Sequence, residues 1–205
     1  MRFNEITKVH YLNEQDDMSR EQIKEIIERD CAPYLEQIGD KPLLRGMPID
    51  QQFLKKRTRL ADRIPKDSPP ELHKMINKYF VKAFKRPFRN AMFCTGVLAD
   101  AKTYGTAYAV YPIGKFQYLW SPSVTDLWTT YEDNLYDMTE QIIDNGFPRE
   151  DAENMTPEFL NKTYKLFLKE FVVGEFIHNK GLQKAIQSGK EVMVWCEEYY
   201  AVKYE

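Results

Sequence analysis

The sequence predicts a single α+β domain over residues 1–205, and three observations lead to this fold class. Apolar residues at helical spacing precede and interrupt several short strand-like runs. The strand-helix-strand rhythm of a parallel sheet does not recur, and no internal repeat is visible. A chain of 205 residues with 43% hydrophobic and 14% aromatic residues is long enough to bury one ordinary core.

The N-terminal region predicts a helix followed by a short strand. Ser19 and Gln22 form a capping-box pattern ahead of apolar residues at helical spacing, so we expect a helix that breaks near Pro33 and resumes to residue 38. A glycine and a proline then end the helix, and the run "LL" before Arg45 begins a strand that delivers this arginine beside Gly46.

The rest of the chain predicts further elements in the same alternating style. Residues 51–63 are polar and basic without an apolar stripe, and we assign no element there. The remaining expected elements are a helix over 68–84, a strand, turn and short helix over 90–105, a hairpin over 106–120 bent at 112–114, helices over 121–146 and 156–173, a short helix over 179–189, and a strand or hairpin over 190–205.

Composition excludes several classes of protein. No apolar run approaches the roughly 20 residues that span a bilayer. Residues 1–17 lack the apolar centre of a secretory signal, so we expect a cytoplasmic protein without a membrane anchor. The three cysteines are far apart and the chain has only three histidines, so neither a disulfide framework nor a metal centre is predicted.

The net charge of -2 conceals an uneven distribution along the chain. Residues 55–89 carry 12 Lys or Arg against 3 acidic residues, whereas residues 132–205 carry 15 acidic residues against 8 basic ones. Two interpretations remain open. The two stretches are either solvated faces of opposite sign, or the basic stretch binds a phosphate-bearing ligand, a cofactor or a nucleic acid.

Three signals that carry chemistry follow one another along the chain. Arg45 ends the strand in "PLLRG", Thr95 lies in the strand end "MFCTG" ahead of "ADAKTYG", and Glu191 precedes the terminal strand "VMVW". Together with "LWSPSVTDLW" at 119–128, this order resembles the mono-ADP-ribosyltransferase superfamily, in the branch with an arginine, a Ser-Thr-Ser-type strand and a late glutamate. The chain is similar to small phage-encoded members from about residue 41 to residue 200.

The resemblance implies a fold and a function. The expected fold is an ADP-ribosyltransferase-like core of short mixed strands in two small sheets, with an N-terminal helix and a helical insertion at 131–180. The expected activity is transfer of ADP-ribose from NAD, as co-substrate, to a host protein or nucleic acid in the host-cell cytoplasm, with release of nicotinamide.

The chemistry explains why these residue types are needed. Cleavage of the nicotinamide–ribose bond passes through an oxocarbenium-like state, which a carboxylate stabilises, and Glu191 is implied in that role. Arginine offers a planar charged fork for a pyrophosphate, so Arg45 is implied as its clamp. Thr95 is implied to orient the glutamate. The residues implied to line the cofactor pocket are Arg45, Gly46, Cys94, Thr95, Gly96, Tyr104 and Phe116.

The chain departs from the branch pattern at three positions. Gly189 stands two residues before Glu191, where much of the branch has Glu or Gln that helps select and activate the acceptor. Cys94 and Gly96 flank Thr95 in place of the two serines. These changes leave the acceptor open.

The departures also favour alternative functions. The protein could be a catalytically inactive member of the same fold that serves as a virion component or an inhibitor of host defence, or a nucleic-acid-binding module that uses residues 55–89. A hydrolase with Cys94 as nucleophile and His73 as base is a further alternative. Glu197 and Glu198 are expected at the opposite end of the terminal strand from Glu191.

Overall fold

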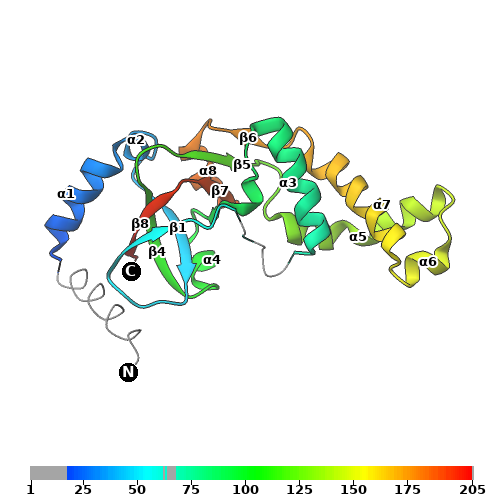
Figure 1. The fold of residues 1–205 in the computed structure, drawn as a ribbon. Coiled ribbons are helices and arrows are strands. Elements are labelled where there is room, and N and C mark those ends of the chain that lie inside the picture. The colour runs from blue at the N-terminus through cyan, green and yellow to red at the C-terminus, as the bar shows by residue number, and fades with distance from the viewer. Residues whose placement is uncertain (1–17, 62, 64–67, 205) are drawn as a thin grey trace, which may run out of the picture.

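The computed structural model describes residues 18–61, 63 and 68–204. It confirms the predicted α+β class, because helices pack around two four-stranded sheets (Figure 1). The expectation about a secretory signal concerns residues 1–17 and lies outside the described residues. Within the part of the chain that is described, no helix is long and apolar enough to cross a membrane.

The two sheets are each made of segments from distant parts of the sequence. Sheet A has the order β1 (Leu43–Met47), β4 (Thr106–Pro112), β8 (Glu198–Lys203) and β2 (Phe53–Arg57). Sheet B has the order β3 (Met92–Cys94), β7 (Val192–Trp195), β5 (Gln117–Trp120) and β6 (Ile177–His178). Neighbouring strands in both sheets run antiparallel, which corrects the expected mixture of strand directions.

The N-terminal helix forms as predicted. Ser19 caps α1 (Arg20–Asp30), and its side chain and that of Gln22 complete a capping box. The helix stops at Cys31, and a short helix α2 (Ala32–Leu35) follows with a proline in its first turn. Ile23 and Ile27 of α1 are buried in one cluster with Phe53 and Tyr200, so α1 covers the outer face of sheet A at its β2 side.

The hairpin predicted over 106–120 is wrong, and of the two forms expected over 190–205 the hairpin does not occur, because each pair of consecutive strands is divided between the two sheets. β4 pairs with β1 and β8, whereas β5 pairs with β6 and β7. In the same way β7 joins sheet B and β8 joins sheet A. The alternation of apolar and polar residues indicates that a segment is an extended strand, but it does not identify the strand with which that segment pairs.

A strand that the sequence did not indicate is β2. Only Phe53 and Leu54 at its start are buried, and the basic residues that follow conceal the alternation. The strand forms at the edge of sheet A, where Lys55 and Arg57 both make ion pairs with Glu198 on β8. Few of its side chains are buried, and the strand is held in place by its backbone hydrogen bonds to β8.

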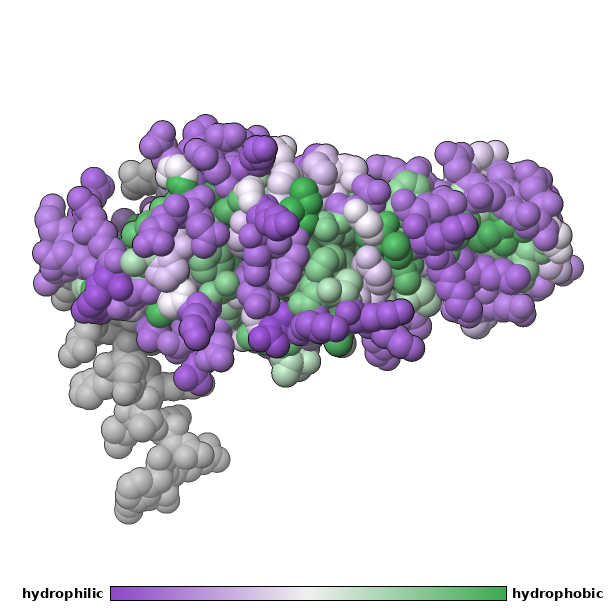
Figure 2. Space-filling model, turned by 90° about the horizontal axis from the view of Figure 1, so that it is seen from above, coloured by the Kyte–Doolittle hydropathy of each residue, from purple (hydrophilic) through white to green (hydrophobic). Residues whose placement is uncertain are grey.

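Helices cover sheet B and extend away from it. α3 (Pro70–Phe84) shares a buried cluster with Leu119 of β5 and Met193 of β7. α5 (Leu127–Asp144), α6 (Arg149–Glu153), α7 (Pro157–Phe167) and the π-helical turn η2 (Leu168–Val172) form an arm that projects from the sheets (Figure 1). Figure 2 shows mostly hydrophilic side chains over the far end of this arm.

The boundaries of the helical arm differ from the expected insertion at 131–180. The arm begins four residues earlier, at Leu127, and the helical part ends at Val172. β6 lies inside the expected insertion, yet it pairs with β5 as the last strand of sheet B. The segment after the arm therefore belongs to the sheet core.

The remaining short elements stand next to the junction of the two sheets. They are the 3-10 turn η1 (Phe88–Asn90), α4 (Leu98–Lys102) after β3, and α8 (Leu182–Ser188) before β7. At the junction Leu44 of β1 pairs with Thr95, just beyond β3, through N–H to O distances of 2.7 and 2.9 Å. This bridge joins an edge of sheet A to an edge of sheet B, and we call it the seam.

We predict that the seam tolerates no side chain at two glycines. A Cβ atom at Gly46 would lie 1.9 Å from the carbonyl oxygen of Ala101, and one at Gly96 would lie 1.8 Å from that of Ile186. Gly46→Ala and Gly96→Ala should each lower the free energy of unfolding by about 1–3 kcal/mol, because backbone atoms must move. Denaturant unfolding measures this loss.

Gly39→Ala is the matched control for both variants. A Cβ atom there would meet only the end of the flexible Gln183 side chain, at 2.3 Å. Its free energy of unfolding should stay within about 0.5 kcal/mol of the wild type. An equal loss in all three variants would contradict the close approach at the seam.

Candidate functional site

The seam brings the three sequence-predicted residues Arg45, Thr95 and Glu191 onto adjacent segments. Leu44, which precedes Arg45, pairs with Thr95. Cys94 pairs with Val192, so the antiparallel register places Thr95 opposite Glu191. The guanidinium of Arg45 donates from Nη1 to the carbonyl oxygen of Phe93 at 3.2 Å. The row crosses β1, β3 and β7 at the point where the two sheets meet.

Thr95 fixes the turn that leads into Glu191. Its Oγ1 donates to the carbonyl oxygen of Gly189 at 3.2 Å and accepts from the amide of Val97 at 3.1 Å. Gly189 ends α8 in the left-handed conformation, with φ of 70°, which a glycine adopts without strain. The hydroxyl of Thr95 thus positions the backbone two residues before the carboxyl group.

Glu191 is a mostly buried carboxyl group in a crowded electrostatic environment. Its side chain is 16% exposed and lies 3.4 Å from Nη1 of Arg89, measured to Oε1. Burial, with the nearby charge of Asp126 acting in the same direction, raises the pKa of Glu191 to about 8, although Arg89 and Arg63 oppose the shift. The group is therefore largely protonated at neutral pH and can ionise in the mildly alkaline range.

Two arginines that sequence reasoning did not single out lie over the ring of Phe93, whose carbonyl oxygen accepts the hydrogen bond from Arg45. The guanidinium of Arg63 lies over this ring at 3.9 Å and that of Arg89 at 4.8 Å, measured to the ring centroid. Arg63 also donates to the carbonyl oxygen of Ala91. Burial and the neighbouring charges of Arg45 and Arg89 lower the pKa of Arg63 to about 10, so it stays charged at neutral pH.

The arginine side chains keep unused hydrogen-bonding capacity. The Nε atoms of Arg45 and Arg89 are buried and make no hydrogen bond with any of the described residues. Arg89 is only 3% exposed. Because buried donors are normally satisfied, this cluster has the composition of a site for an anionic ligand.

A polar network holds Arg89 in place. Its amide donates to Oδ1 of Asn77 at 2.9 Å, and its Nη2 donates to Oγ of Ser68 at 3.1 Å. Nδ2 of Asn77 donates to Oδ1 of Asn90 at 2.8 Å, and Nε2 of His73 lies 3.0 Å from the same oxygen. Burial lowers the pKa of His73, so the imidazole is neutral and serves this network.

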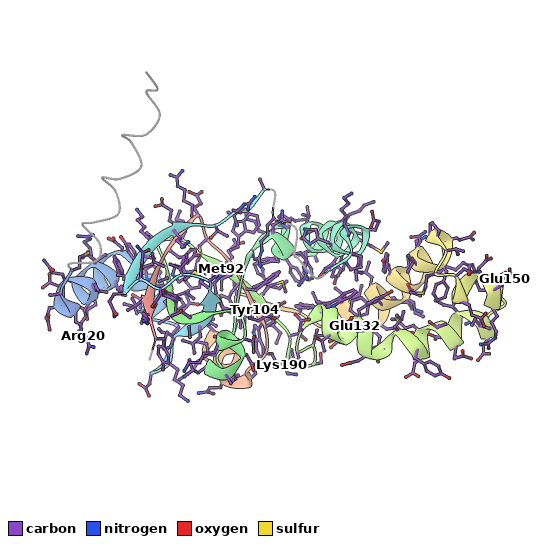
Figure 3. All side chains as sticks on the ribbon, turned by 90° about the horizontal axis from the view of Figure 1, so that it is seen from below. Arg20, Met92, Tyr104, Glu132, Glu150 and Lys190 are labelled. Carbon is purple, nitrogen blue, oxygen red and sulfur yellow. The ribbon has the colours of Figure 1, made fainter. Side chains whose placement is uncertain are left out.

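Of the other predicted pocket residues, Gly46, Gly96 and Tyr104 lie next to the seam. Gly46 packs against Ala101 and the Cβ atom of Tyr104, and the Tyr104 side chain is 71% exposed. Gly96 packs against the carbonyl group of Ile186. Figure 3 shows Met92, Tyr104 and Lys190 in the central part of the molecule, between α1 and the arm that carries Glu132 and Glu150.

Phe116 does not join the group around Glu191. Its ring packs against those of Tyr34 and Tyr118, at centroid distances of 5.6 and 6.0 Å. The next residue, Gln117, pairs with Trp195 at the far end of β7. Phe116 therefore lies about five residues of strand away from Glu191, too far for both to contact one nicotinamide ring.

The structure disfavours the cysteine hydrolase. Burial raises the pKa of Cys94 to about 12, so its thiol is protonated at neutral pH. The imidazole of His73 is engaged with Asn77 and Asn90. Glu198 lies beyond the opposite end of β7, as expected for it and Glu197, and pairs with two basic residues of β2.

The missed residues had only partial signals in the sequence. Arg63 and Arg89 lie within the basic stretch 55–89, but nothing distinguished them from its other basic residues. Asp126 stands before an apolar helix in the manner of an N-cap, which predicts a structural role alone. Their approach to Glu191 depends on tertiary contacts between segments far apart in the chain.

A cavity elsewhere offers no comparable chemistry. It has a volume of about 620 Å³ and lies between α1 and sheet A, with Ile23, Ile27 and Tyr111 among its lining residues. None of the seam residues lines it. We therefore place the candidate site at the seam, where charged groups and unpaired donors gather.

Comparisons of the chain with protein-family models, with curated proteins and with solved structures give no match. The chemistry of the seam is therefore the basis for assigning a function.

We predict that Glu191→Gln stabilises the protein in a pH-dependent way. The folded pKa of about 8 exceeds the usual 4.5, so the stability that Glu191 contributes is present below pH 4.5 and is lost as the pH rises to about 8. Glutamine mimics the neutral acid. The gain in free energy of unfolding should be near zero at pH 4.5 and on the order of 5 kcal/mol at pH 8.5.

Denaturant unfolding at several pH values measures this difference. Glu140→Gln, at an exposed ion pair with Arg149 on the arm, is the control and should not show the trend. Parallel curves for Glu191→Gln and the wild type between pH 4.5 and 8.5 would contradict a protonated Glu191.

Proposed function

We propose that this protein is an NAD-dependent mono-ADP-ribosyltransferase that transfers ADP-ribose to a host protein or nucleic acid and releases nicotinamide. The observation that carries the proposal is the row of Arg45, Thr95 and Glu191 across the seam. These are the residues that the family resemblance implies, and they come from segments about 50 and 100 residues apart in the sequence.

The charge distribution fits a dinucleotide. The guanidinium groups of Arg63 and Arg89 over the Phe93 ring, and that of Arg45 at the Phe93 carbonyl oxygen, can neutralise the two negative charges of a pyrophosphate. The buried Nε atoms of Arg45 and Arg89 are available to donate hydrogen bonds to it. Glu191 is the carboxyl group beside this cluster. A dinucleotide with phosphates near the arginines would bring its ribose toward that carboxyl group.

In the proposed reaction the bond between nicotinamide and ribose breaks, and the electron pair leaves with nicotinamide. The ionised Glu191 stabilises the positive charge that develops on the ribose. A nucleophile of the acceptor then adds to the anomeric carbon and loses its proton. Thr95 keeps the backbone before Glu191 fixed, and Arg89 holds the carboxylate.

We predict that the activity requires Glu191 and the arginines. In an assay with labelled NAD and host-cell extract, Glu191→Gln should reduce nicotinamide release and label transfer by about 100-fold or more. Arg45→Lys should keep the charge but lose the planar fork, so that it mainly raises KM for NAD. Glu197→Gln, beyond the far end of β7, is the control and should leave both rates unchanged.

The outcomes separate the enzyme from an inactive scaffold. Transfer that disappears only in the Glu191 and arginine variants would support the enzyme and identify the acceptor. If the intact protein neither binds NAD nor releases nicotinamide, the proposal is wrong, and the fold serves as a binding or structural protein.

The exposed face of α3 favours a second candidate function, contact with a nucleic acid. Lys74, Lys78 and Lys82 are exposed at four-residue spacing on this helix. Such a row presents positive charges about 6 Å apart along the helix axis, and a row of this kind can contact the phosphates of a nucleic acid. The face could bind a nucleic acid as acceptor or as sole ligand.

We predict that this face makes any nucleic-acid binding strongly salt-dependent. The triple variant Lys74→Gln, Lys78→Gln and Lys82→Gln should reduce the slope of log affinity against log salt by about 2–3, as measured by fluorescence anisotropy with labelled DNA and RNA. The control is Lys162→Gln, Lys165→Gln and Lys169→Gln on the arm. Equal slopes in the wild type and the α3 variant would contradict nucleic-acid binding by this face of α3.

A further inference from the structure

We infer that Asn90 is a positioning residue for the arginine cluster at the seam (Arg45, Arg63 and Arg89). Its buried side-chain amide joins the segment before Arg63 to α3, and so holds Arg63 over the Phe93 ring beside Arg89. The inference deepens the proposed function, on which its effect on NAD rests, whereas binding of a simple anion tests it separately. Asn90 ends the turn η1 and is 8% exposed.

The side-chain amide of Asn90 binds two different segments of the chain. Its Nδ2 donates to the carbonyl oxygens of Leu60 and Ala61, at 2.9 and 3.4 Å. These residues stand three and two positions before Arg63. Its Oδ1 accepts from Nδ2 of Asn77 on α3 at 2.8 Å. Asparagine carries two N–H donors and an acceptor on one short side chain, and both kinds of group are used here.

Asn77 extends the connection from Asn90 to Arg89. Its Oδ1 accepts from the backbone amide of Arg89 at 2.9 Å, while its Nδ2 binds Asn90. The two asparagines therefore link the backbone before one arginine to the backbone of the other. Because α3 packs against sheet B, both arginine-bearing segments are attached to the same helix and, through it, to the sheet.

A buried histidine completes the network. Nε2 of His73 lies 3.0 Å from Oδ1 of Asn90 and 3.0 Å from Nδ2 of Asn77. His73 is 5% exposed. Hydrogen bonds in such a buried environment are stronger than hydrogen bonds in water, so the network favours one arrangement of the segments that it joins.

Arg63 is held at both its backbone and its guanidinium group. Asn90 binds the backbone just before it, and its guanidinium donates to the carbonyl oxygen of Ala91, the residue after Asn90. That guanidinium lies 3.9 Å from the centroid of the Phe93 ring, and the guanidinium of Arg89 lies 4.8 Å from the same centroid. Two like charges over one ring repel each other, so this arrangement needs support from the backbone.

The network prepares the two arginines for an anion before the anion binds. If the segment before Arg63 were loose, the repelling guanidinium groups would separate, and an anion would have to order them at a cost in affinity. Arg45 joins the cluster by a different route, because it stands on β1 and donates to the carbonyl oxygen of Phe93. Loss of the Asn90 amide should therefore weaken the contribution of Arg63 and leave that of Arg45.

The experiment measures the affinity of the protein for inorganic pyrophosphate by isothermal titration calorimetry, without NAD. Asn90→Leu keeps a neutral side chain of similar size but removes its hydrogen bonds. The dissociation constant should rise about tenfold, the equivalent of one hydrogen bond to a charged group. Asn90→Ser, which is polar but too short to bind both segments, should change the affinity in the same direction.

Asn134→Leu is the matched control. Asn134 lies on α5 in the arm, where its Nδ2 donates to the carbonyl oxygen of Thr130 at 2.8 Å. This variant should bind pyrophosphate as the wild type does. Wild-type affinity in Asn90→Leu or Asn90→Ser, with circular dichroism and unfolding midpoints that show an intact fold, would overturn the inference. A folded wild-type protein that binds no pyrophosphate would overturn it as well.

A double-mutant cycle separates positioning of Arg63 from a general loosening of the site. In a protein that already carries Arg63→Gln, Asn90→Leu should raise the dissociation constant by no more than about twofold, because Asn90 acts through Arg63. In a protein that carries Arg45→Gln, the same change should still raise it about tenfold. Equal losses of affinity in the two backgrounds would contradict a role that acts through Arg63.

Turnover gives a second and separable readout. Asn90→Leu should raise KM for NAD about tenfold and change kcat for nicotinamide release by no more than about twofold, because Arg63 binds phosphate and not the reacting carbon. If pyrophosphate binding follows the cycle but no nicotinamide is released, the inference stands and the proposed function is wrong. If nicotinamide is released and KM stays unchanged in folded Asn90→Leu, the proposed function stands and the role of Asn90 is wrong.

Discussion

The bridge between Leu44 and Thr95 is the interaction on which the rest of the structure depends. Two backbone hydrogen bonds of 2.7 and 2.9 Å join the edge of one sheet to the edge of the other. The bridge sets the register between the strand that carries Arg45 and the segment that carries Thr95, which lies opposite Glu191. Two glycines next to the bridge, Gly46 and Gly96, allow α4 and α8 to approach the seam.

The seam concentrates charge in a place that is unfavourable for folding alone. Arg63 and Arg89 lie over the ring of Phe93, and Arg45 donates to the carbonyl oxygen of the same residue. The Nε atoms of Arg45 and Arg89 have no hydrogen-bond partner among the described residues, and Glu191 holds a proton that most glutamates would release. Each of these features costs stability, since buried polar groups are normally paired. Such costs cluster at sites that bind or react, and an anionic ligand would satisfy the arginines.

The sequence predicts local structure here better than it predicts pairing. Ser19, Thr156 and Gly189 mark helix ends correctly, because capping depends on neighbouring residues. The hairpin predicted over 106–120 was wrong, because pairing depends on distant segments. At the site, the order of Arg45, Thr95 and Glu191 was visible in the chain. The residues that surround them, Arg63, Arg89 and Asp126, could not be identified from the sequence, because their contacts form only in the folded protein.

A crystal structure of Glu191→Gln with NAD would test the account most directly, because this variant keeps the shape of the protonated acid and should not consume its ligand. The account predicts a pyrophosphate within hydrogen-bonding distance of Arg45 and the nicotinamide ribose beside residue 191. NAD bound in the cavity between α1 and sheet A, or no NAD at concentrations that saturate the wild type, would contradict the claim that the seam is a dinucleotide site.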